Sequence, residues 1–518
     1  MADKTHDADA DPSVLSRGTP SGDRTNDIWF QHSSAKRVNT DTIIAQSLAR
    51  QYPSLELTIA PPTNGLSLVA YAQAGHARCT AIVEAPGDDS GVFAPVAWSE
   101  YMPPPRRIDG NPGALRATLR FAKFAYVWRG YDFIVYVVDG RDGTEPYGGG
   151  TNQYVLCGER ADAEALLLAA GGWANELHGE VWVFDQGFWQ KNAELFHSVM
   201  GASWDSVILD PGMKKAIIDD HVSFFESRDT YGRLKVPWKR GIIYHGPPGN
   251  GKTISIKATM HMLYARKEPI PTLYVRSLFS YGGPERALMD VFQKARQFAP
   301  CYLVFEDLDS IVSDQVRSYF LNEVDGLKNN DGIFMIGSTN HLDRLDPGIS
   351  VSPWLYPYLY LTPKLFAKRA NFHKKKRPSR FDRKYFFPDP DLEQRIAYCK
   401  FWQKKLADNK DIEFPDELCK AVAEITDKFS FAYMQEAFVA ALLAIARRSK
   451  DGETRSEESL TREMGDGWLD VCGGGDDGDL DELVLWIEIK KQIEILREGM
   501  ESEQTTVAHS RNRFQGDF

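Results

Sequence analysis

The chain has 518 residues, of which 43% are hydrophobic and 26% charged, and its formal net charge is −11 at pH 7. This length allows two or three domains with separate cores, and the acidic balance argues against a dominant surface for nucleic acid or anionic membrane. No apolar run approaches the roughly 20 residues that span a bilayer, and the polar start is unlike a signal or transit peptide. We therefore expect a soluble, cytoplasmic protein, with mitochondrial and nuclear locations left open.

The first part of the chain predicts an α+β domain that could select a substrate or partner. Residues 1–25 are polar and are expected to be disordered, and the domain is expected over residues 26–200. Strands are predicted in the stretches "LSLVAYAQ", "AIVEAP", "LRFAKFAYVWRGYDFIVYVVDGRDG", "NQYVLCG" and "GEVWVFDQGFW", with a turn at Arg129-Gly130 in the third. A helix is predicted in "ADAEALLLAAGGWANEL". No catalytic motif is visible in this region.

The following residues, 201–386, predict an α/β domain with a parallel sheet, because strand and helix patterns alternate. The four strand-led units begin at "GIIYHG", "TLYV", "CYLVFEDLDS" and "GIFMIGSTN". Three helical patterns over residues 387–450 indicate a small helical lid domain. The rest is expected to be an acidic linker over 451–482, a helix over 483–500 and a loose tail over 501–518.

The stretch "GPPGNGKT" fits G-x-x-x-x-G-K-[ST] between a strand and a helix, the context that a phosphate-binding loop requires. Glycines let the loop curl so that backbone N–H groups point at phosphate, and the helix N-terminus favours the negative charge. The lysine would contact the β and γ phosphates of ATP, and the threonine hydroxyl would contact Mg²⁺. The nucleotide-binding residues are thus predicted to be Gly246, Pro247, Pro248, Gly249, Asn250, Gly251, Lys252 and Thr253.

A buried strand that ends in two carboxylates, Glu306 and Asp307, supplies the second motif. Mg²⁺ prefers oxygen ligands and keeps several waters, so one carboxylate can hold the metal while its neighbour faces the γ-phosphate. We expect Glu306 and Thr253 to organise Mg²⁺ and Asp307 to polarise the attacking water. The alternative is that Asp307 or Asp309 only caps the following helix.

Two later segments complete the predicted site. Asn340, at the end of another apolar strand, could hold the attacking water against the γ-phosphate, although an asparagine there could also be a simple turn residue. In the basic run "KKKRPSRFDR", Arg377 and Arg380 could act as arginine fingers on the site of a neighbouring subunit. A targeting signal is the alternative for the start of that run.

Together these residues resemble the AAA family of ring-forming ATPases. The matching stretches are "GPPGNGKT", "LVFEDLDS", "STNHLDRLDP" and "RPSRFDR". The order Glu then Asp, and the lead-in "WDSVILDPGMKKAIIDDHVSFF", resemble the clade of the mitochondrial Rieske-protein translocase. That translocase has an N-terminal membrane helix, and none is predicted in this sequence, so we expect a closer resemblance to soluble fungal or bacterial members of the clade.

Two further features bear on the resemblance. Residues 348–376 form an insertion with three prolines, six aromatic residues and no Asp or Glu. It is either a loop at the subunit interface or a translated intron, and we favour the intron. The segment "LFSYGG" stands where AAA proteins carry a pore loop, which makes Tyr281 and Gly282 candidates to grip a substrate, with an ordinary glycine turn as the alternative.

The resemblance implies an enzyme that hydrolyses ATP with Mg²⁺ in a homo-oligomeric ring, a hexamer or heptamer, and remodels, translocates or chaperones a protein substrate. No nucleic-acid partner and no transmembrane segment are expected. One rival reading is an ATP-binding scaffold with little turnover, which the inverted carboxylates and the insertion favour. A second rival, a P-loop kinase or GTPase, is disfavoured because the guanine-reading Asn-Lys-x-Asp motif is absent and because Asn340 and the helical lid argue against it.

Overall fold

The computed structural model describes residues 28, 31–36, 38–83, 95–104, 106–140, 150–313, 315–325, 329–345, 381–409, 412–450, 480 and 482–513. The predicted disordered start, the insertion 348–376, Arg377 and Arg380 lie outside these described residues, as does nearly all of the acidic linker. The chain divides into two compact units, Met1–Glu176 and Leu177–Phe518, and each is described by itself.

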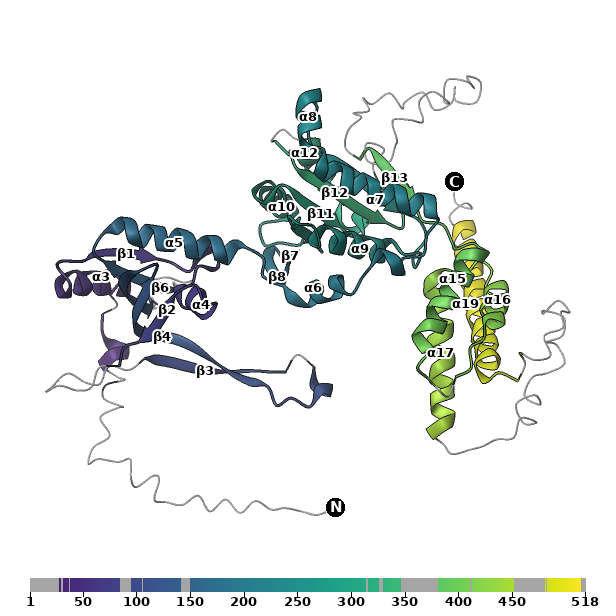
Figure 1. Cartoon of the computed structure of the whole chain (residues 1–518), viewed down its shortest axis with the longest axis horizontal. Coiled ribbons are helices and arrows are strands. Elements are labelled where there is room, and N and C mark those ends of the chain that lie inside the picture. Colours follow the sequence, from purple (N-terminus) through teal and green to yellow (C-terminus); the bar gives the residue numbers. More distant parts are fainter. Residues whose placement is uncertain are drawn as a thin grey trace, which may run out of the picture. The chain divides into compact units, whose positions relative to one another are not determined.

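The first unit is an antiparallel sheet with helices on both faces (Figure 1). Its strands run in the order β1-β6-β5-β4-β2, and β3 pairs with β4. The strands are β1 (Glu56–Ala60), β2 (Arg78–Ala81), β3 (Val96–Met102), β4 (Ala114–Trp128), β5 (Tyr131–Asp139) and β6 (Thr151–Cys157). The helices are α3 (Thr40–Gln51), α4 (Leu68–Gln73) and α5 (Arg160–Asn175), with short 3₁₀ turns at η1 (Thr63–Gly65) and η2 (Arg107–Asp109).

Alternation of side chains explains how one sheet supports two cores. On β5, Val135 and Val137 pack with α4 and α5, whereas Tyr136 and Val138 pack with α3. This is the period of two that a strand imposes. The predicted turn between β4 and β5 is confirmed, because Arg129 and Gly130 both have positive φ, as a tight two-residue hairpin requires.

Two strand predictions in this unit differ from the structure. Strand β2 ends at Ala81, the first residue of "AIVEAP", and residues 84–86 of that stretch lie outside the described part of the chain. The stretch "LSLVAYAQ" contains helix α4, not a strand. Ser67 caps the helix by accepting a hydrogen bond from the backbone N–H of Ala70, at 3.2 Å. Leu68 and Tyr71, three residues apart, are the side chains that become buried, so the run follows the helical period.

The second unit contains a seven-stranded sheet in the order β13-β9-β12-β11-β10-β7-β8, and every neighbouring pair except β7–β8 is parallel. The strands are β7 (Val181–Asp185), β8 (Phe188–Asn192), β9 (Arg240–His245), β10 (Thr272–Val275), β11 (Cys301–Phe305), β12 (Ile333–Thr339) and β13 (Arg383–Phe386). The predicted parallel α/β sheet is thus present. The carboxyl ends of β9, β10, β11 and β12 lie along one edge.

Helices cover both faces of this sheet, as a parallel sheet requires. One face packs against α7 (Pro211–Glu226) and α9 (Lys252–Tyr264), and the other against α10 (Pro284–Phe298) and α12 (Arg317–Asp325). Shorter elements are α6 (Ala193–Met200), η3 (Trp204–Ser206), α8 (Arg228–Leu234), α11 (Leu308–Ile311) and η4 (Leu342–Arg344). All five residues of β11 are buried, which accounts for its continuous apolar sequence.

The boundary between the units differs from the predicted one at residue 200. It falls between Glu176 and Leu177, because β7 pairs with β10 in the parallel sheet instead of with the first unit. The stretch "GEVWVFDQGFW" was expected in the N-terminal domain. It does form a strand and a turn, but it supplies the edge hairpin β7–β8 of the second sheet.

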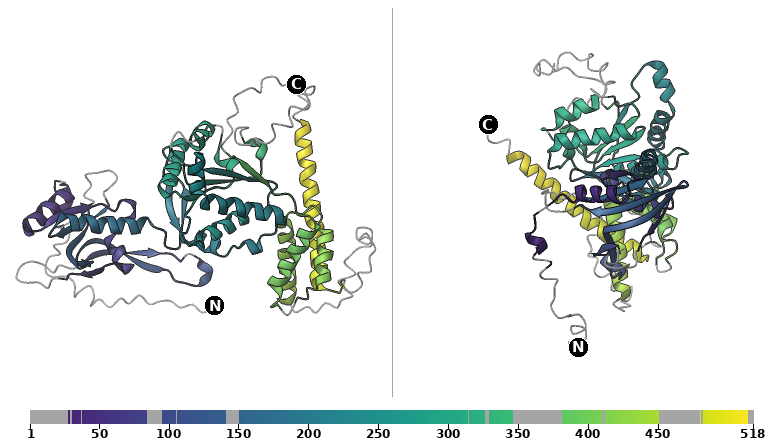
Figure 2. Two further views of the ribbon diagram at one scale, coloured as in Figure 1. Left: turned by 45° about the horizontal axis from the view of Figure 1, so that its top comes forward. Right: turned by 90° about the vertical axis from the view of Figure 1, so that its left-hand side faces the viewer.

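The chain after β13 forms a helical bundle of α15 (Leu392–Leu406), α16 (Asp416–Ile425), α17 (Phe431–Lys450) and α19 (Val484–Arg513), which share one core (Figure 2). Leu485, Trp486 and Ile489 bring α19 into this core. The helix continues to Arg513, past the end predicted at residue 500, so most of the expected loose tail is helical. Among the described residues, no helix has the length and apolarity to cross a membrane.

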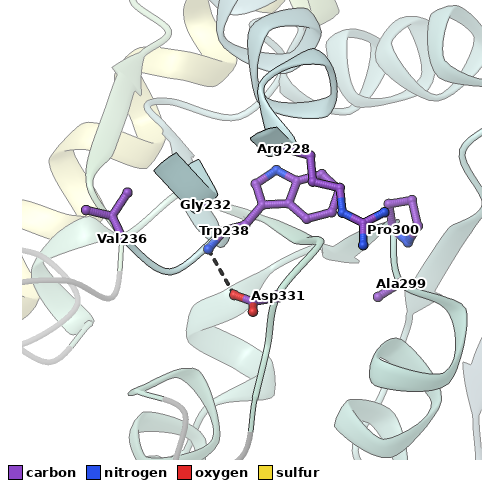
Figure 3. A pocket seen from close by; sticks show the side chains of 7 residues that line it. All are labelled: Arg228, Gly232, Val236, Trp238, Ala299, Pro300 and Asp331. Carbon is purple, nitrogen blue, oxygen red and sulfur yellow. Dashed lines mark hydrogen bonds between the residues drawn. The ribbon is translucent and has the colours of Figure 1, made fainter. Parts of the chain in front are cut away.

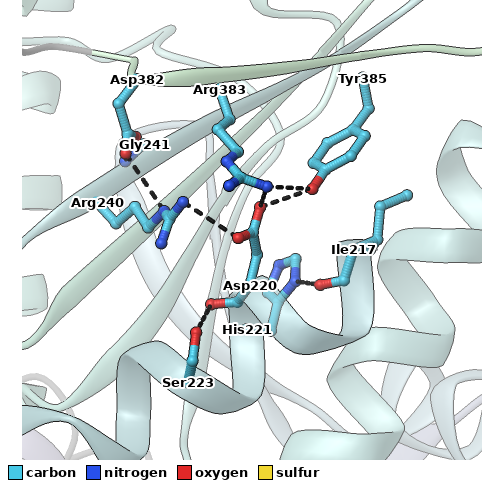
Figure 4. Close-up of polar contacts among 9 residues, drawn as sticks. All are labelled: Ile217, Asp220, His221, Ser223, Arg240, Gly241, Asp382, Arg383 and Tyr385. Atoms are coloured by element: carbon cyan, nitrogen blue, oxygen red, sulfur yellow. Dashed lines mark hydrogen bonds and ion pairs between the residues drawn. The ribbon is translucent and has the colours of Figure 1, made fainter. Parts of the chain in front are cut away.

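A buried carboxylate links α7 to the end of the sheet that is formed by β13 and β9 (Figure 4). Asp220 of α7 forms ion pairs with Arg240 of β9, at 3.1 Å, and with Arg383 of β13, at 3.0 Å. The hydroxyl of Tyr385 donates to the same carboxylate at 2.6 Å. Arg240 also pairs with Asp382, at 3.3 Å, so β13 is fixed to β9 by side chains as well as by its backbone.

We predict that Asp220→Asn lowers the free energy of unfolding by about 2–3 kcal/mol, because two guanidinium groups lose their buried counter-charge. The half-exposed position of Arg383 keeps the loss below that of a fully buried pair. Urea denaturation followed by circular dichroism measures the change. The neighbouring exposed residue provides the control, since Asp219→Asn should be neutral within about 0.5 kcal/mol. Equal effects of the two variants would contradict the assigned anchoring role.

Candidate active site

A cavity of about 510 Å³ lies where the carboxyl edge of the sheet faces the helical bundle. It collects residues from five separate parts of the second unit. Its walls include Pro248, Gly249, Gly251, Lys252, Thr253 and Ile254 of the glycine-rich loop and helix α9, with Asp307, Ser338 and Asn340 from the strand ends, Ser206, Val207 and Ile208 from the segment before α7, and Tyr398, Phe401, Phe431, Ala432 and Gln435 from the bundle. Three motifs that are far apart in sequence therefore meet at one place.

The glycine-rich loop after β9 is packed too closely for side chains at two positions. A Cβ on Gly246, which has φ of +143°, would lie 2.2 Å from the carbonyl oxygen of Phe387. A Cβ on Gly249, with φ of +80°, would lie 2.5 Å from the Cβ of Ala432 in the bundle. Asn250 donates to Asp389 at 2.8 Å. The loop is thus held by the chain that leads from β13 into the bundle.

Lys252 is the buried cation of the cavity. Its amine donates to the carbonyl oxygens of Gly246 and Pro247, both at 2.7 Å. Burial lowers the pKa of this amine, because the charged form loses water, and the carboxylate of Asp307 acts in the opposite direction. An ammonium that is partly stripped of water and stands at a helix N-terminus is well suited to contact phosphate.

Asp307 lines the cavity, and its backbone is left-handed, with φ of 51° and ψ of 54°. It stands at the start of α11, but its side chain makes no capping hydrogen bond to that helix. The capping alternative therefore does not hold for Asp307. Aspartate tolerates the left-handed region better than most residues, and such strained backbone is common at active sites. The turn directs this carboxylate into the cavity.

Glu306, the first carboxylate of the pair, is placed differently. One of its oxygens, Oε2, accepts a hydrogen bond from the hydroxyl of Tyr274 on the neighbouring strand β10. The other, Oε1, is buried and has no hydrogen-bond partner among the described residues. Glu306 is not among the residues that line the cavity, so the two carboxylates are not equivalent. The role of Tyr274 is not predictable from the sequence, because its contact depends on the pairing of β10 with β11.

The end of β12 contributes both a cavity residue and a structural link. Asn340 is exposed and lines the cavity together with Ser338, whose hydroxyl accepts from the backbone N–H of Asp307 at 3.3 Å. The neighbouring Thr339 donates its hydroxyl to Asp309 at 2.6 Å. Asp309 thus binds α11 to β12 and is not among the cavity-lining residues, whereas Asn340 lies where the predicted site needs it.

The bundle supplies an aromatic wall that is not predictable from the sequence. Tyr398 stacks on Phe401, with ring centroids 6.0 Å apart, and lies 5.1 Å from the ring of Phe431. Gln435 lines the cavity from the first turns of α17. Opposite the strand ends, Val207 and Ile208 add an apolar surface. The stretch "WDSVILD" was the only signal for that segment, and none existed for the aromatic contacts between distant helices.

The remaining predicted residues lie elsewhere. Tyr281 is 95% exposed and Phe279 is 70% exposed, in a turn where the backbone N–H of Gly282 donates to the Ser280 hydroxyl at 3.2 Å. This turn follows β10 at the same sheet edge as the cavity. The arginines expected to act in a neighbouring subunit's site are outside the described residues, so their prediction stays open.

A second, smaller cavity of about 280 Å³ lies at the opposite, amino-terminal edge of the sheet (Figure 3). It is lined by Arg228, Gly232, Val236, Trp238, Ala299, Pro300 and Asp331. Trp238 is held there because its backbone N–H donates to Asp331, at 2.9 Å, and its indole N–H donates to Phe224, also at 2.9 Å. None of the predicted site residues lines this cavity, so the larger one is the candidate active site.

Comparison with known families agrees with this assignment. Residues 242–351 match the model of the family described as "ATPase family associated with various cellular activities (AAA)". The matched range includes the carboxylate pair, Asn340, most of β9 and the whole glycine-rich loop that follows β9. The chain therefore carries an AAA ATPase domain, which in general binds and hydrolyses ATP. The match specifies the family and not a clade within it.

We predict that Gly249→Ala weakens ATP binding by roughly tenfold, because the added methyl would collide with Ala432 and strain a backbone with positive φ. Isothermal titration calorimetry with a non-hydrolysable ATP analogue measures the effect. Gly232→Ala is the matched control, since a Cβ at that helical position has nothing within 4 Å. Unchanged affinity in Gly249→Ala would mean that the loop and bundle do not need their close contact.

Proposed function

We propose that the protein hydrolyses ATP to ADP and phosphate in the cavity between the sheet edge and the helical bundle. The observation that carries this proposal is that Lys252, Asp307 and Asn340 line one cavity with Thr253. In the reaction, the oxygen of water bonds to the γ-phosphorus while the bond from that phosphorus to the β–γ bridging oxygen breaks. Asp307 accepts a proton from the water, and Asn340 orients it.

The residues fit a bound Mg²⁺. Glu306 has a buried carboxylate oxygen without a hydrogen-bond donor, and a hydroxyl is available on Thr253 at the start of α9. Both are hard oxygen ligands of the kind Mg²⁺ takes, together with phosphate oxygens. When bound, the ion supplies positive charge against the developing charge on the phosphates. Lys252 supplies the same type of stabilisation from the protein.

We further propose that ATP turnover drives the remodelling, translocation or chaperoning of a protein substrate by a ring of identical subunits. AAA domains commonly act in rings, and a finger such as Arg377 or Arg380 would complete a neighbour's site. The exposed aromatic side chain of Tyr281 supports a role in gripping the substrate. The glutamate-first carboxylate pair favours the clade of the Rieske-protein translocase.

The competing function is an ATP-binding scaffold with little turnover. The observation that favours it is that Glu306 is not among the residues that line the cavity and is bound by Tyr274. The two functions share nucleotide binding and differ in phosphate release. A purified chain that binds ATP but releases no phosphate with Mg²⁺ present would support the scaffold.

We predict that Asp307→Asn leaves ATP affinity within about threefold and lowers turnover by about 10²–10⁴-fold, because the water loses its proton acceptor. Phosphate release under saturating ATP measures turnover. Asp343→Asn, an exposed aspartate on η4, serves as the control and should keep normal turnover. If Asp307→Asn hydrolyses ATP at the normal rate, Asp307 is not the proton acceptor.

A second prediction concerns the hydrogen bond to Glu306. Tyr274→Phe should lower turnover about tenfold and raise the Mg²⁺ concentration needed for half-maximal rate, because a donor to a charged group is lost. Affinity for ATP without Mg²⁺ should stay the same. Tyr264→Phe removes a hydroxyl that donates to the carbonyl of Glu180 at 3.2 Å, away from the cavity, and is the matched control. An unchanged Mg²⁺ dependence in Tyr274→Phe would show that Tyr274 does not position the carboxylate.

A further inference from the structure

Part of the first unit projects from its sheet as a two-stranded ribbon, formed by β3, residues 114–120 of β4 and the turn between them (Figure 1). β5 pairs with β4 only from Phe121 onward, and β2 only from Phe124. Among the described residues, the ribbon therefore has no third strand on either edge. Two strands alone are marginally stable in water, so a ribbon of this length gains from a further contact.

The two faces of the ribbon differ in chemistry. On one face the polar groups are already paired: Arg116 forms an ion pair with Glu100, at 2.8 Å, and the guanidinium of Arg120 lies 3.3 Å from the ring centre of Trp98. On the other face, cross-strand pairing places Tyr101 opposite Leu115, Ser99 opposite Ala117 and Ala97 opposite Leu119. We call this second surface the apolar face.

The apolar face carries large side chains that no described residue covers. Leu115 is 74% exposed and Tyr101 is 62% exposed. Tyr101 is held in place, because its hydroxyl donates to the carbonyl of Pro112 at 2.9 Å and its ring lies against Gly113. An ordered aromatic ring beside an exposed leucine offers a ready binding surface, since little side-chain entropy is lost on contact.

The ribbon is also basic within an acidic chain. Its sequence holds Arg106, Arg107, Arg116 and Arg120 against Glu100 and Asp109, whereas the whole chain has a net charge of −11. The arginines in the strands have acidic partners in Glu100 and Asp139. Arg106 and Arg107 are exposed in the turn beside Ile108, which is 82% exposed. The tip thus attracts negative charge next to apolar surface.

We propose that the ribbon binds an extended, acidic polypeptide segment of the protein substrate, which adds as a strand to the edge of β3. This inference rests on the proposed remodelling function and names the class of segment it acts on. A free strand edge supplies backbone donors and acceptors, the apolar face supplies contacts for alternate side chains, and the tip arginines select acidic flanks. Parallel face-to-face pairing of two ribbons is disfavoured, because it would bring the arginine tips together.

The test uses the full-length chain with ATP and a fluorescein-labelled peptide in which Val and Thr alternate between two Glu residues at each end. Fluorescence anisotropy should show binding, weakened about tenfold by Leu115→Ser. Arg106→Glu should weaken it about threefold, with the difference fading at high salt. A peptide with Lys in place of Glu, and one with a central Pro, should bind more weakly to the unaltered protein.

Matched substitutions in the same unit separate the ribbon from general effects. Leu168→Ser changes a leucine on α5 that is 78% exposed, and Lys36→Glu reverses an exposed charge, so both should bind the peptide normally. Equal affinity of all variants would overturn the proposal. It would also be overturned if Leu115→Ser changed the mass of the assembly in light scattering and left peptide affinity unchanged, because the ribbon would then join copies of this chain.

Measuring ATP turnover in the same samples keeps the two proposals apart. Ribbon variants are expected to hydrolyse ATP at the normal basal rate, since the substitutions lie outside the cavity. If ATP is hydrolysed normally and the ribbon variants bind the peptide as tightly as the unaltered protein, only the ribbon proposal is overturned. Absence of hydrolysis in the unaltered protein, together with ribbon-dependent peptide binding, would defeat only the proposed enzymatic function.

Discussion

The position of β9 between two parallel partners is the constraint on which the site depends. Its backbone is paired with β12 on one side and β13 on the other, and residues 241–244 are buried. The glycine-rich loop therefore starts from a fixed point. The same chain returns after β13 and packs on the loop, since Phe387 lies against Gly246 and Asp389 accepts from Asn250. The glycine-rich loop, the sheet edge and the helical bundle are therefore held together by direct contacts.

Asp220 on α7 connects the segment before that helix to the same set of contacts. That helix begins at Pro211, shortly after Val207 and Ile208, which line the cavity. The carboxylate of Asp220 forms ion pairs with Arg240 at the start of β9 and with Arg383 at the start of β13. A displacement of β13 would therefore shift both the glycine-rich loop and the segment with Val207 and Ile208 that lines the cavity. In sequence, β13 directly follows the segment that contains Arg377 and Arg380.

The local features of the site could be predicted from the sequence, because each depends on a short run of consecutive residues. The glycine-rich loop, the carboxylates after β11 and Asn340 after β12 all follow short apolar runs bounded by turn residues, and these runs form the buried strands β9, β11 and β12. What could not be predicted depends on pairing between distant segments. The assignment of β7 to the second sheet, the bond from Tyr274 to Glu306 and the aromatic wall of the bundle are of this kind. The helix α4 was missed because a short apolar run fits either period until its burial is known.

The inverted order of the two carboxylates, Glu306 then Asp307, corresponds to different positions of their side chains in the structure. The shorter of the two side chains, that of Asp307, lines the cavity from a backbone in the left-handed region. The longer Glu306 lies behind it, where its extra length lets one oxygen meet Tyr274 while the other stays without a donor. A glutamate in place of Asp307 would carry its carboxylate further into the cavity, and an aspartate in place of Glu306 would fall short of the tyrosine hydroxyl. The two exchanges fit each other, so the order Glu then Asp is a matched arrangement of the two side chains.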